Sequence, residues 1–189
     1  MLVRYNNLIS EIAKCRPSSI MEIGTWNGVH ASQMYLEAAK YNDDVIYYGF
    51  DLFEIRDDKI NKAEHNAKRV QTIKSVQATL NENGVKYKLH QGFSRDTIPA
   101  FTPDRPVDFI YIDGGHSVDT IRDDWNNCQR LIHDDTVIIF DDYYHHRDDV
   151  GCNQVVDSID RDQYKVEFIG EIDRTKAGQL IQFVKVVKV

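Results

Sequence analysis

The sequence has few cysteines, no long apolar run and no apolar leader, and each absence excludes a class of protein. Cys15, Cys128 and Cys152 are scattered and form no CxxC pair, so we expect neither a disulfide framework nor a zinc site. The longest apolar runs, such as Val137–Phe140, are far too short to span a membrane. Polar residues and Glu11 occupy the region where a signal peptide needs an apolar stretch, so we expect a cytoplasmic protein.

Basic residues are outnumbered as well. The chain has 23 Lys and Arg against 30 Asp and Glu, which gives a formal net charge of −7. A broad phosphate-binding surface needs an excess of Lys and Arg over Asp and Glu, so nucleic acid is disfavoured as a partner. No repeat, low-complexity tract or Pro/Gly-rich linker divides the 189 residues, and we predict one domain over residues 1–189.

Short apolar runs alternate with longer amphipathic stretches along the chain. After a helical segment that ends at Pro17, five runs rich in Val, Ile, Tyr and Phe are predicted as strands: Ser19–Ile23, Val45–Phe50, Val85–His90, Val107–Ile112 and Thr136–Phe140. Helices are predicted between and after them at about Val29–Lys40, Asp58–Asn81, Val118–Leu131 and Cys152–Asp160. Several strands are nearly apolar on both faces, which is typical of a parallel sheet covered by helices on both sides.

Two further runs, Tyr164–Ile169 and Leu180–Val187, have no helix-length segment between them. The stretch Asp173–Gly178 is interpreted as a turn, so this pair is predicted to form an antiparallel hairpin. The predicted fold is therefore α/β, a doubly wound, mostly parallel seven-stranded sheet with a C-terminal antiparallel hairpin. Ligands of such sheets bind at the carboxyl ends of the strands.

The loops after the first two strands carry glycines and acids. The first strand continues as MEIGTWNG, in which Gly24 and Gly28 let the backbone pass close to a ligand. This is not the G-x-G-x-x-G of dinucleotide binding. Glu22 can accept hydrogen bonds from loop amides or face a cationic ligand. Asp51, after the second strand, suits the two hydroxyls of a ribose, with a helix N-cap as the alternative.

The third strand is followed by HQGFSRDTIP. Gly92 allows close approach and Phe93 offers a flat apolar surface, so the two could flank an adenine ring. The alternative is that Phe93 only belongs to the core.

Acids gather after the fourth and fifth strands. Asp113 follows one, and Asp141 and Asp142 follow the other. Side by side they repel one another, and a divalent cation with oxygen ligands, most naturally Mg²⁺, relieves the repulsion. The alternative is that the Asp-Asp pair only forms a turn. His116 could be a metal ligand, a general base or a helix-start residue.

Two charged regions are interpreted as solvated surface. Asp119, Asp123 and Asp124 lie on a predicted helix and are assigned to its exposed face. The charge mixture over residues 57–74, which includes Lys68, is interpreted as the surface of a soluble helix.

These residues resemble the class I S-adenosylmethionine-dependent methyltransferases. Within that class the chain is similar to the metal-dependent sugar O-methyltransferases of the macrocin O-methyltransferase-like family. The resemblance runs from roughly Ser19 to Val187 and is carried by MEIGTWNG, YYGFDLF, HQGFSRDTIP, FIYIDGGHS and IIFDDYY. It implies a Rossmann-like methyltransferase fold, S-adenosyl-L-methionine and Mg²⁺ as cofactors, and transfer of a methyl group to a hydroxyl.

The resemblance also implies roles for individual residues. The cofactor pocket would be formed by Glu22, Gly24, Thr25, Trp26, Gly28, Asp51, Leu52, Gly92, Phe93, Ser94 and Asp113. The metal ligands would be Asp113, Asp141 and Asp142. His116 would be the general base, acting beside Asp113 as the second catalytic residue.

Departures from the family leave the acceptor and the assembly open. Asp141 stands where some relatives have Glu. Larger relatives carry an N-terminal extension that builds the substrate pocket and the oligomer, and only about twenty residues precede the first motif here, so homo-oligomerisation remains open. Catechol and caffeoyl-CoA O-methyltransferases typically have Lys at the place of His116, which favours a sugar or glycan hydroxyl as the acceptor. The alternatives are a catechol-type enzyme, a non-catalytic binding module and an NAD-dependent oxidoreductase.

Overall fold

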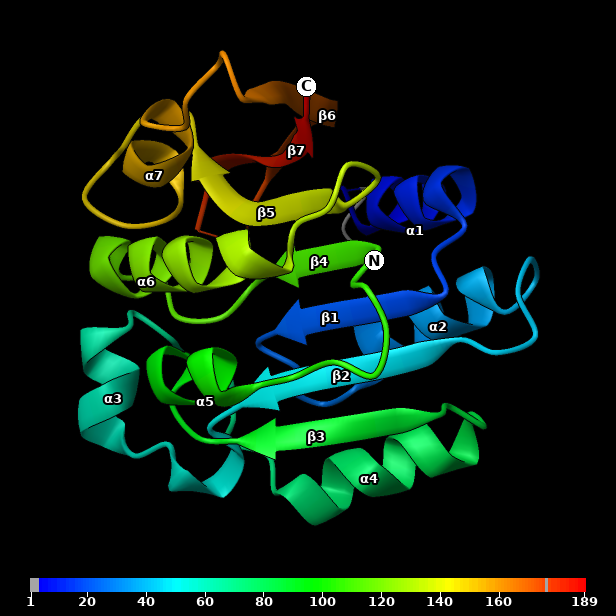
Figure 1. The fold of residues 1–189 in the computed structure, drawn as a ribbon. Coiled ribbons are helices and arrows are strands. Elements are labelled where there is room, and N and C mark those ends of the chain that lie inside the picture. Colours follow the sequence, from blue (N-terminus) through cyan, green and yellow to red (C-terminus); the bar gives the residue numbers. More distant parts are fainter. Residues whose placement is uncertain (1–3, 176) are drawn as a thin grey trace.

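A computed structural model describes residues 4–175 and 177–189, in which seven strands form one sheet in the order β3-β2-β1-β4-β5-β7-β6 (Figure 1). The strands are β1 (Ser19–Ile23), β2 (Ile46–Asp51), β3 (Tyr87–Gln91), β4 (Phe109–Ile112), β5 (Val137–Tyr144), β6 (Tyr164–Arg174) and β7 (Leu180–Lys188). The first five run parallel, whereas β7 is antiparallel to both β5 and β6. The predicted parallel sheet with its terminal hairpin is confirmed.

Helices cover both faces of this sheet (Figure 1). One face carries α1 (Arg4–Cys15), α2 (Val29–Ala38) and α4 (Ile73–Glu82), and the other carries α5 (Ser94–Ala100), α6 (Val118–Cys128) and α7 (Asn153–Asp157). The helix α3 (Asp58–Ala63) lies beyond the carboxyl ends of the strands. Two 3-10 turns, η1 (Phe53–Ile55) and η2 (Gln129–Leu131), complete the connections.

Two hydrophobic cores lie on the two sides of the sheet. In β1, Ile20 packs into the core shared with Leu8 of α1, and its neighbour Met21 packs into the opposite core with Trp125 of α6. Successive side chains of a strand point to opposite faces, and both faces here are covered. This is why the central strands are apolar at most positions.

The prediction of a single helix over residues 58–81 was wrong. The Asp57 carboxylate accepts a hydrogen bond of 2.8 Å from the Ile60 amide and begins α3, which ends at Ala63. The Thr72 hydroxyl accepts one of 3.1 Å from the Ser75 amide and begins α4. Side-chain caps of this kind define helix ends. The segment between the two helices is not helical and runs along the carboxyl ends of the sheet.

The hairpin strands are longer than predicted, because β6 continues to Arg174 before the turn to Leu180. The helix α5 lies in a stretch for which only a ligand-binding loop was considered. Among the described residues, no helix is both long and apolar enough to cross a membrane.

Candidate active site

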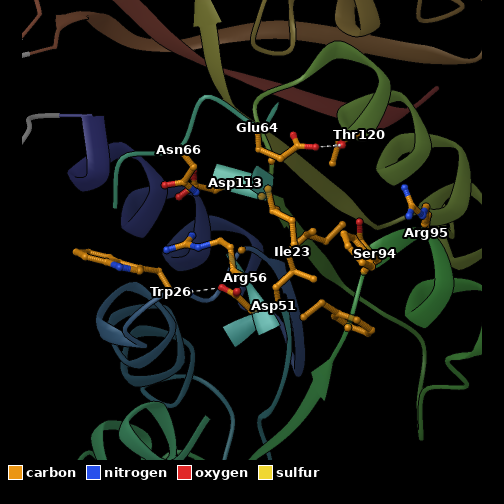
Figure 2. A pocket seen from close by; sticks show the side chains of 18 of the residues that line it. Ile23, Trp26, Asp51, Arg56, Glu64, Asn66, Ser94, Arg95, Asp113 and Thr120 are labelled. Carbon is orange, nitrogen blue, oxygen red and sulfur yellow. Dashed lines mark hydrogen bonds between the residues drawn. The ribbon is translucent and has the colours of Figure 1, made fainter. Parts of the chain in front are cut away.

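A cavity lies at the carboxyl ends of β1, β2, β3 and β4 (Figure 2). It encloses about 840 Å³, counting the part open to solvent, which suits a small-molecule ligand. Eight residues predicted to bind the cofactor line it: Gly24, Trp26, Asp51, Leu52, Gly92, Phe93, Ser94 and Asp113. The structure therefore brings the loops after four separate strands together around one space.

Gly24 allows two of these loops to meet. Its φ is +97°, and a side-chain Cβ built there would lie 2.0 Å from the carbonyl oxygen of Asp113. The Gly24 amide donates to the Phe50 carbonyl at 2.8 Å, and the Asp113 amide donates to the Ile23 carbonyl at 2.9 Å. Only glycine accepts both this conformation and this contact. The backbone after β1 is thus held against β2 and β4 and forms the floor of the cavity.

Asp51, at the end of β2, projects into the wall of the cavity. Its two carboxylate oxygens accept hydrogen bonds from the backbone amides of Trp26, at 2.7 Å, and of Phe53, at 2.9 Å. These bonds fix the orientation of the carboxylate. Each oxygen has a further lone pair, so Asp51 can still accept hydrogen bonds from the hydroxyls of a ligand.

Three predicted cofactor residues, Glu22, Thr25 and Gly28, are not among the described residues that line the cavity. Glu22 is buried and accepts a hydrogen bond from the Tyr47 hydroxyl, which also lies 3.1 Å from the Thr25 hydroxyl. Burial raises the pKa of Glu22 to about 8, against the opposing effect of this hydrogen bond. Glu22 is therefore linked through the Tyr47 hydroxyl to Thr25 in the loop after β1.

Asp113, His116 and Asp142 form a cluster beside the cavity. Each offers one ligand atom, and these atoms all lie within 4.8 Å of one another. The Nε2 atom of His116 is 3.1 Å from Oδ2 of Asp142. Burial raises the pKa of the Asp113 carboxyl, opposed by the charge of Lys68 and reinforced by Asp141 and Asp142. Two carboxylates and an imidazole in this arrangement can hold a divalent cation or can move a proton.

A bulge aims Asp142 at this cluster. The register between β5 and β7 shifts between Phe140 and Tyr143, and Asp142 has a φ of +62°. Adjacent residues of a regular strand point to opposite faces, and a bulge redirects one of them. Asp tolerates the left-handed conformation better than most residues. Asp141 and Asp142 therefore have different surroundings although they are neighbours in the sequence.

Asp141 was predicted as a metal ligand beside Asp113 and Asp142, but its carboxylate is engaged elsewhere. The Arg4 guanidinium donates to both of its oxygens, at 3.1 and 3.2 Å, and the Tyr111 hydroxyl donates at 3.0 Å. Burial acts to raise the pKa of Asp141, yet the charge of Arg4 and the hydrogen bonds outweigh it and hold this pKa below its usual value. Among the described residues, the cluster with ligand spacing contains His116 in its place.

The segment between α3 and α4 supplies residues that sequence reasoning missed. Glu64 accepts hydrogen bonds from the Thr120 hydroxyl, at 2.7 Å, and from the Ser117 amide, at 3.1 Å, both at the start of α6. Lys68 places its ammonium 3.5 Å from Asp113 Oδ2. Lys68 was assigned to a solvated helix surface, and instead it lines the cavity with Glu64. The capping residues Asp57 and Thr72 were the sequence signal that could have separated this segment from a helix.

Comparison with known proteins now identifies the family. The model of a family described as "Methyltransferase domain" matches residues 21–143, which is more than half of the chain. The chain belongs to this methyltransferase family. The matched region begins in β1 and ends in β5, so it contains all three members of the Asp–His–Asp cluster. No curated protein sequence matches this methyltransferase.

Solved structures similar to this methyltransferase share its fold at low sequence identity. The O-methyltransferase TomG from Streptomyces achromogenes, in complex with SAM, has a TM-score of 0.70 and 15% identity, over 98% of this chain and 79% of that one. An O-methyltransferase from Bacillus cereus, in complex with SAH, has a TM-score of 0.67 and 14% sequence identity, over 97% of this chain and 80% of that one. A putative rRNA methylase from Clostridium thermocellum has a TM-score of 0.67 and 13% sequence identity, over 97% of both chains. At these identities the likeness shows the fold.

Proposed function

We propose that this methyltransferase transfers a methyl group from S-adenosyl-L-methionine to a hydroxyl oxygen of a sugar or glycan, with Mg²⁺ at the acidic cluster and His116 as general base. The observation that carries the proposal is the double position of Asp113. It lines the cavity and also belongs to the Asp–His–Asp cluster. A ligand in the cavity therefore lies next to groups that can bind a cation and accept a proton.

The chain's residues fit the cofactor. Gly24 gives the backbone a close approach, and Asp51 offers hydroxyl-binding oxygens at the end of β2, the usual place for a ribose. Two similar structures that are named O-methyltransferases are described in complex with SAM and with SAH. These points support S-adenosylmethionine as the methyl donor and oxygen as the atom that receives the methyl group.

The residues of the cluster also fit Mg²⁺. Asp113 and Asp142 would hold the ion, because buried carboxylates this close together are stabilised by a hard cation. When bound, the cofactor supplies a methyl group on a positively charged sulfur, and the metal supplies positive charge that favours an ionised acceptor oxygen. Lys68 contributes a further positive charge, 3.5 Å from Asp113 Oδ2.

His116 is placed to take the proton. Its Nε2 faces Asp142, and when Nε2 donates there, the Nδ1 lone pair is left to accept the proton of an acceptor hydroxyl. No hydrogen-bond partner of Nδ1 occurs among the described residues. We assign Asp142 to orienting this imidazole as well as to holding the metal. Asp141 and Arg4 act as positioning residues for the strand that carries Asp142.

The sugar acceptor follows from the histidine at position 116, where catechol-type relatives typically have lysine. The net charge of −7 gives no support to a nucleic-acid acceptor, although two of the similar structures are described as rRNA methylases. A catechol acceptor is the main competing outcome, since one similar structure is described as a putative caffeoyl-CoA O-methyltransferase from Staphylococcus aureus.

The test is transfer of a labelled methyl group by the purified chain. S-Adenosylmethionine is incubated with glycans, sugar nucleotides and catechols, with MgCl₂ and with EDTA. Labelled sugar products that disappear with EDTA and return with Mg²⁺ are expected. If only catechols become labelled, the acceptor is a catechol and the sugar assignment is wrong. If activity persists in EDTA, the reaction does not need the proposed metal. Absence of S-adenosylmethionine binding in calorimetry would leave a non-catalytic module.

A further inference from the structure

Each of the three acids at the ends of β4 and β5 contacts a basic side chain, and the three basic side chains come from segments that are distant in the sequence. The pairs are Arg4–Asp141, His116–Asp142 and Lys68–Asp113. All three acids are buried, and a buried carboxylate is costly without a nearby positive charge. The pairs therefore lower the cost of bringing three acids together in one place.

Lys68 is held less firmly than the other two basic residues. Its side chain is 33% exposed, against 7% for Arg4 and 16% for His116. Arg4 donates two hydrogen bonds to Asp141, whereas the Lys68 ammonium lies 3.5 Å from Asp113 Oδ2, beyond the usual length of an N–H···O bond. A long side chain that reaches solvent and makes a contact of this length can turn away at small cost.

The backbone at Lys68 is fixed by its own contacts. The Nη2 atom of Arg56 donates to the Lys68 carbonyl at 2.8 Å, and the Trp26 indole nitrogen donates to the Arg69 carbonyl at 2.9 Å. The Lys68 ammonium lies 5.7 Å from the centre of the Trp26 ring. Rotation about the side-chain bonds of Lys68 can therefore carry the ammonium away from Asp113 while the backbone of the segment stays in place.

A divalent cation held by Asp113 and Asp142 would share the Asp113 carboxylate with this ammonium. One ligand atom each from Asp113, His116 and Asp142 lies within 4.8 Å of the others, and Oδ2 of Asp113 faces Lys68. Two cations at one carboxylate repel each other, and burial strengthens the repulsion. Of the two, the ammonium has a path to solvent.

We propose that Lys68 is an exchangeable counter-ion of Asp113, whose ammonium pairs with the carboxylate in the metal-free chain and turns away when a divalent cation binds. The inference rests on the proposed function, because it needs a metal at Asp113 and Asp142. Lys68 is thus a positioning residue. It holds the Asp113 carboxylate beside the cavity and lowers the affinity of the cluster for the metal.

The first experiment measures Mn²⁺ binding by calorimetry, with neither methyl donor nor acceptor present. We expect Lys68→Met to bind Mn²⁺ about 10- to 100-fold more tightly than the wild type, the range for a contact between charged groups. Lys68→Arg keeps the charge and should not bind more tightly. The matched control is Lys62→Met, which makes the same change at an exposed position of α3 and should keep the wild-type affinity.

The outcomes separate the inference from the proposed function. Equal or weaker binding by Lys68→Met would overturn the inference and leave the proposed metal site standing. If neither the wild type nor Lys68→Met binds Mn²⁺, the metal is removed from the proposed function itself.

The second experiment needs no variant, so a folding defect cannot account for its result. The wild-type chain is acetylated with acetic anhydride, with and without saturating Mn²⁺, and the labelling of each lysine is measured by mass spectrometry. We expect Mn²⁺ to raise the labelling of Lys68 severalfold, toward that of the exposed Lys62, whose own labelling should not change. If the labelling of Lys68 stays the same or falls with Mn²⁺, the ammonium does not leave Asp113 and the inference fails.

Discussion

Arg4 in α1 holds Asp141 in β5 through two hydrogen bonds, from Nε at 3.1 Å and from Nη2 at 3.2 Å. Both side chains are buried. The Tyr5 hydroxyl approaches the same carboxylate at 3.5 Å, and the Tyr111 hydroxyl at 3.0 Å. The first helix is thereby joined to the strand whose next residue, Asp142, faces His116.

Substitution of Arg4 by Met should therefore destabilise the protein. The change leaves the Asp141 carboxylate buried without its cation, and removing one partner of a buried pair costs about 3–5 kcal/mol. Urea denaturation of the wild type and the variant measures the loss in the free energy of unfolding. Lys14→Met is the control and should lose much less, because Lys14 is exposed and its buried partner Glu11 keeps a second ion pair with Lys185. Equal losses would mean that the Arg4–Asp141 pair has no special role.

Substitution of His116 by Ala should lower kcat by about 10²- to 10⁴-fold, the usual contribution of a general base. Affinity for S-adenosylhomocysteine should be unchanged, because the imidazole is not among the described residues lining the cavity. Single-turnover methyl transfer and calorimetry measure the two quantities. If excess Mg²⁺ restores the rate of the variant, His116 acts as a metal ligand and its assignment as base is wrong.

Stability should depend on pH through Glu22. Its pKa in the folded chain, about 8, lies above the ordinary value of 4.5. Between these two values the folded state binds more protons than the unfolded state, so stability falls as the pH rises. Glu22→Gln should make this decline shallower. Urea midpoints at pH 5.5, 7 and 8.5 measure it. The pKa of Asp124 is also raised, so the variant should still lose some stability as the pH rises. If Glu22→Gln leaves the pH dependence of stability unaltered, Glu22 is ionised in the folded chain.

Substitution of Asp51 by Ala should weaken binding of S-adenosylmethionine about tenfold, the loss expected for a hydrogen bond to a charged acceptor. The KM of the acceptor should change little, because Asp51 lies at the end of β2, away from the Asp–His–Asp cluster. Steady-state kinetics with each substrate varied in turn separates the two effects. Asp51→Asn keeps one carbonyl oxygen and should recover part of the affinity. A larger effect on the acceptor would place the ribose elsewhere.

The sheet could be predicted because its causes are local. Strands covered on both faces must be apolar at successive positions, and β1 and β4 show this pattern directly in the sequence. The carboxyl ends of parallel strands meet at one edge, so the convergence of Gly24, Asp51 and Asp113 on one cavity followed from the order of the elements.

The finer arrangement of the site depends on contacts between distant residues. Nothing near Asp141 in the sequence reveals that Arg4 neutralises it, and strand periodicity does not predict the bulge that redirects Asp142. Asp124 carries the same charge as its exposed neighbour Asp123, and only the packing of α6 distinguishes them. Likewise, nothing in the charged run over residues 57–74 distinguishes Lys68, which lines the cavity, from its exposed neighbours.

Glu64 fastens the segment between α3 and α4 to the start of α6 through its two carboxylate oxygens and through its carbonyl, which accepts from the His116 amide at 3.3 Å. Each such bond contributes only about 1 kcal/mol, and none involves the two cores. Breaking these bonds would therefore release this side of the segment without disturbing either core. Because one of these bonds joins Glu64 to the backbone of His116, any opening of this segment would also release the backbone of the proposed base.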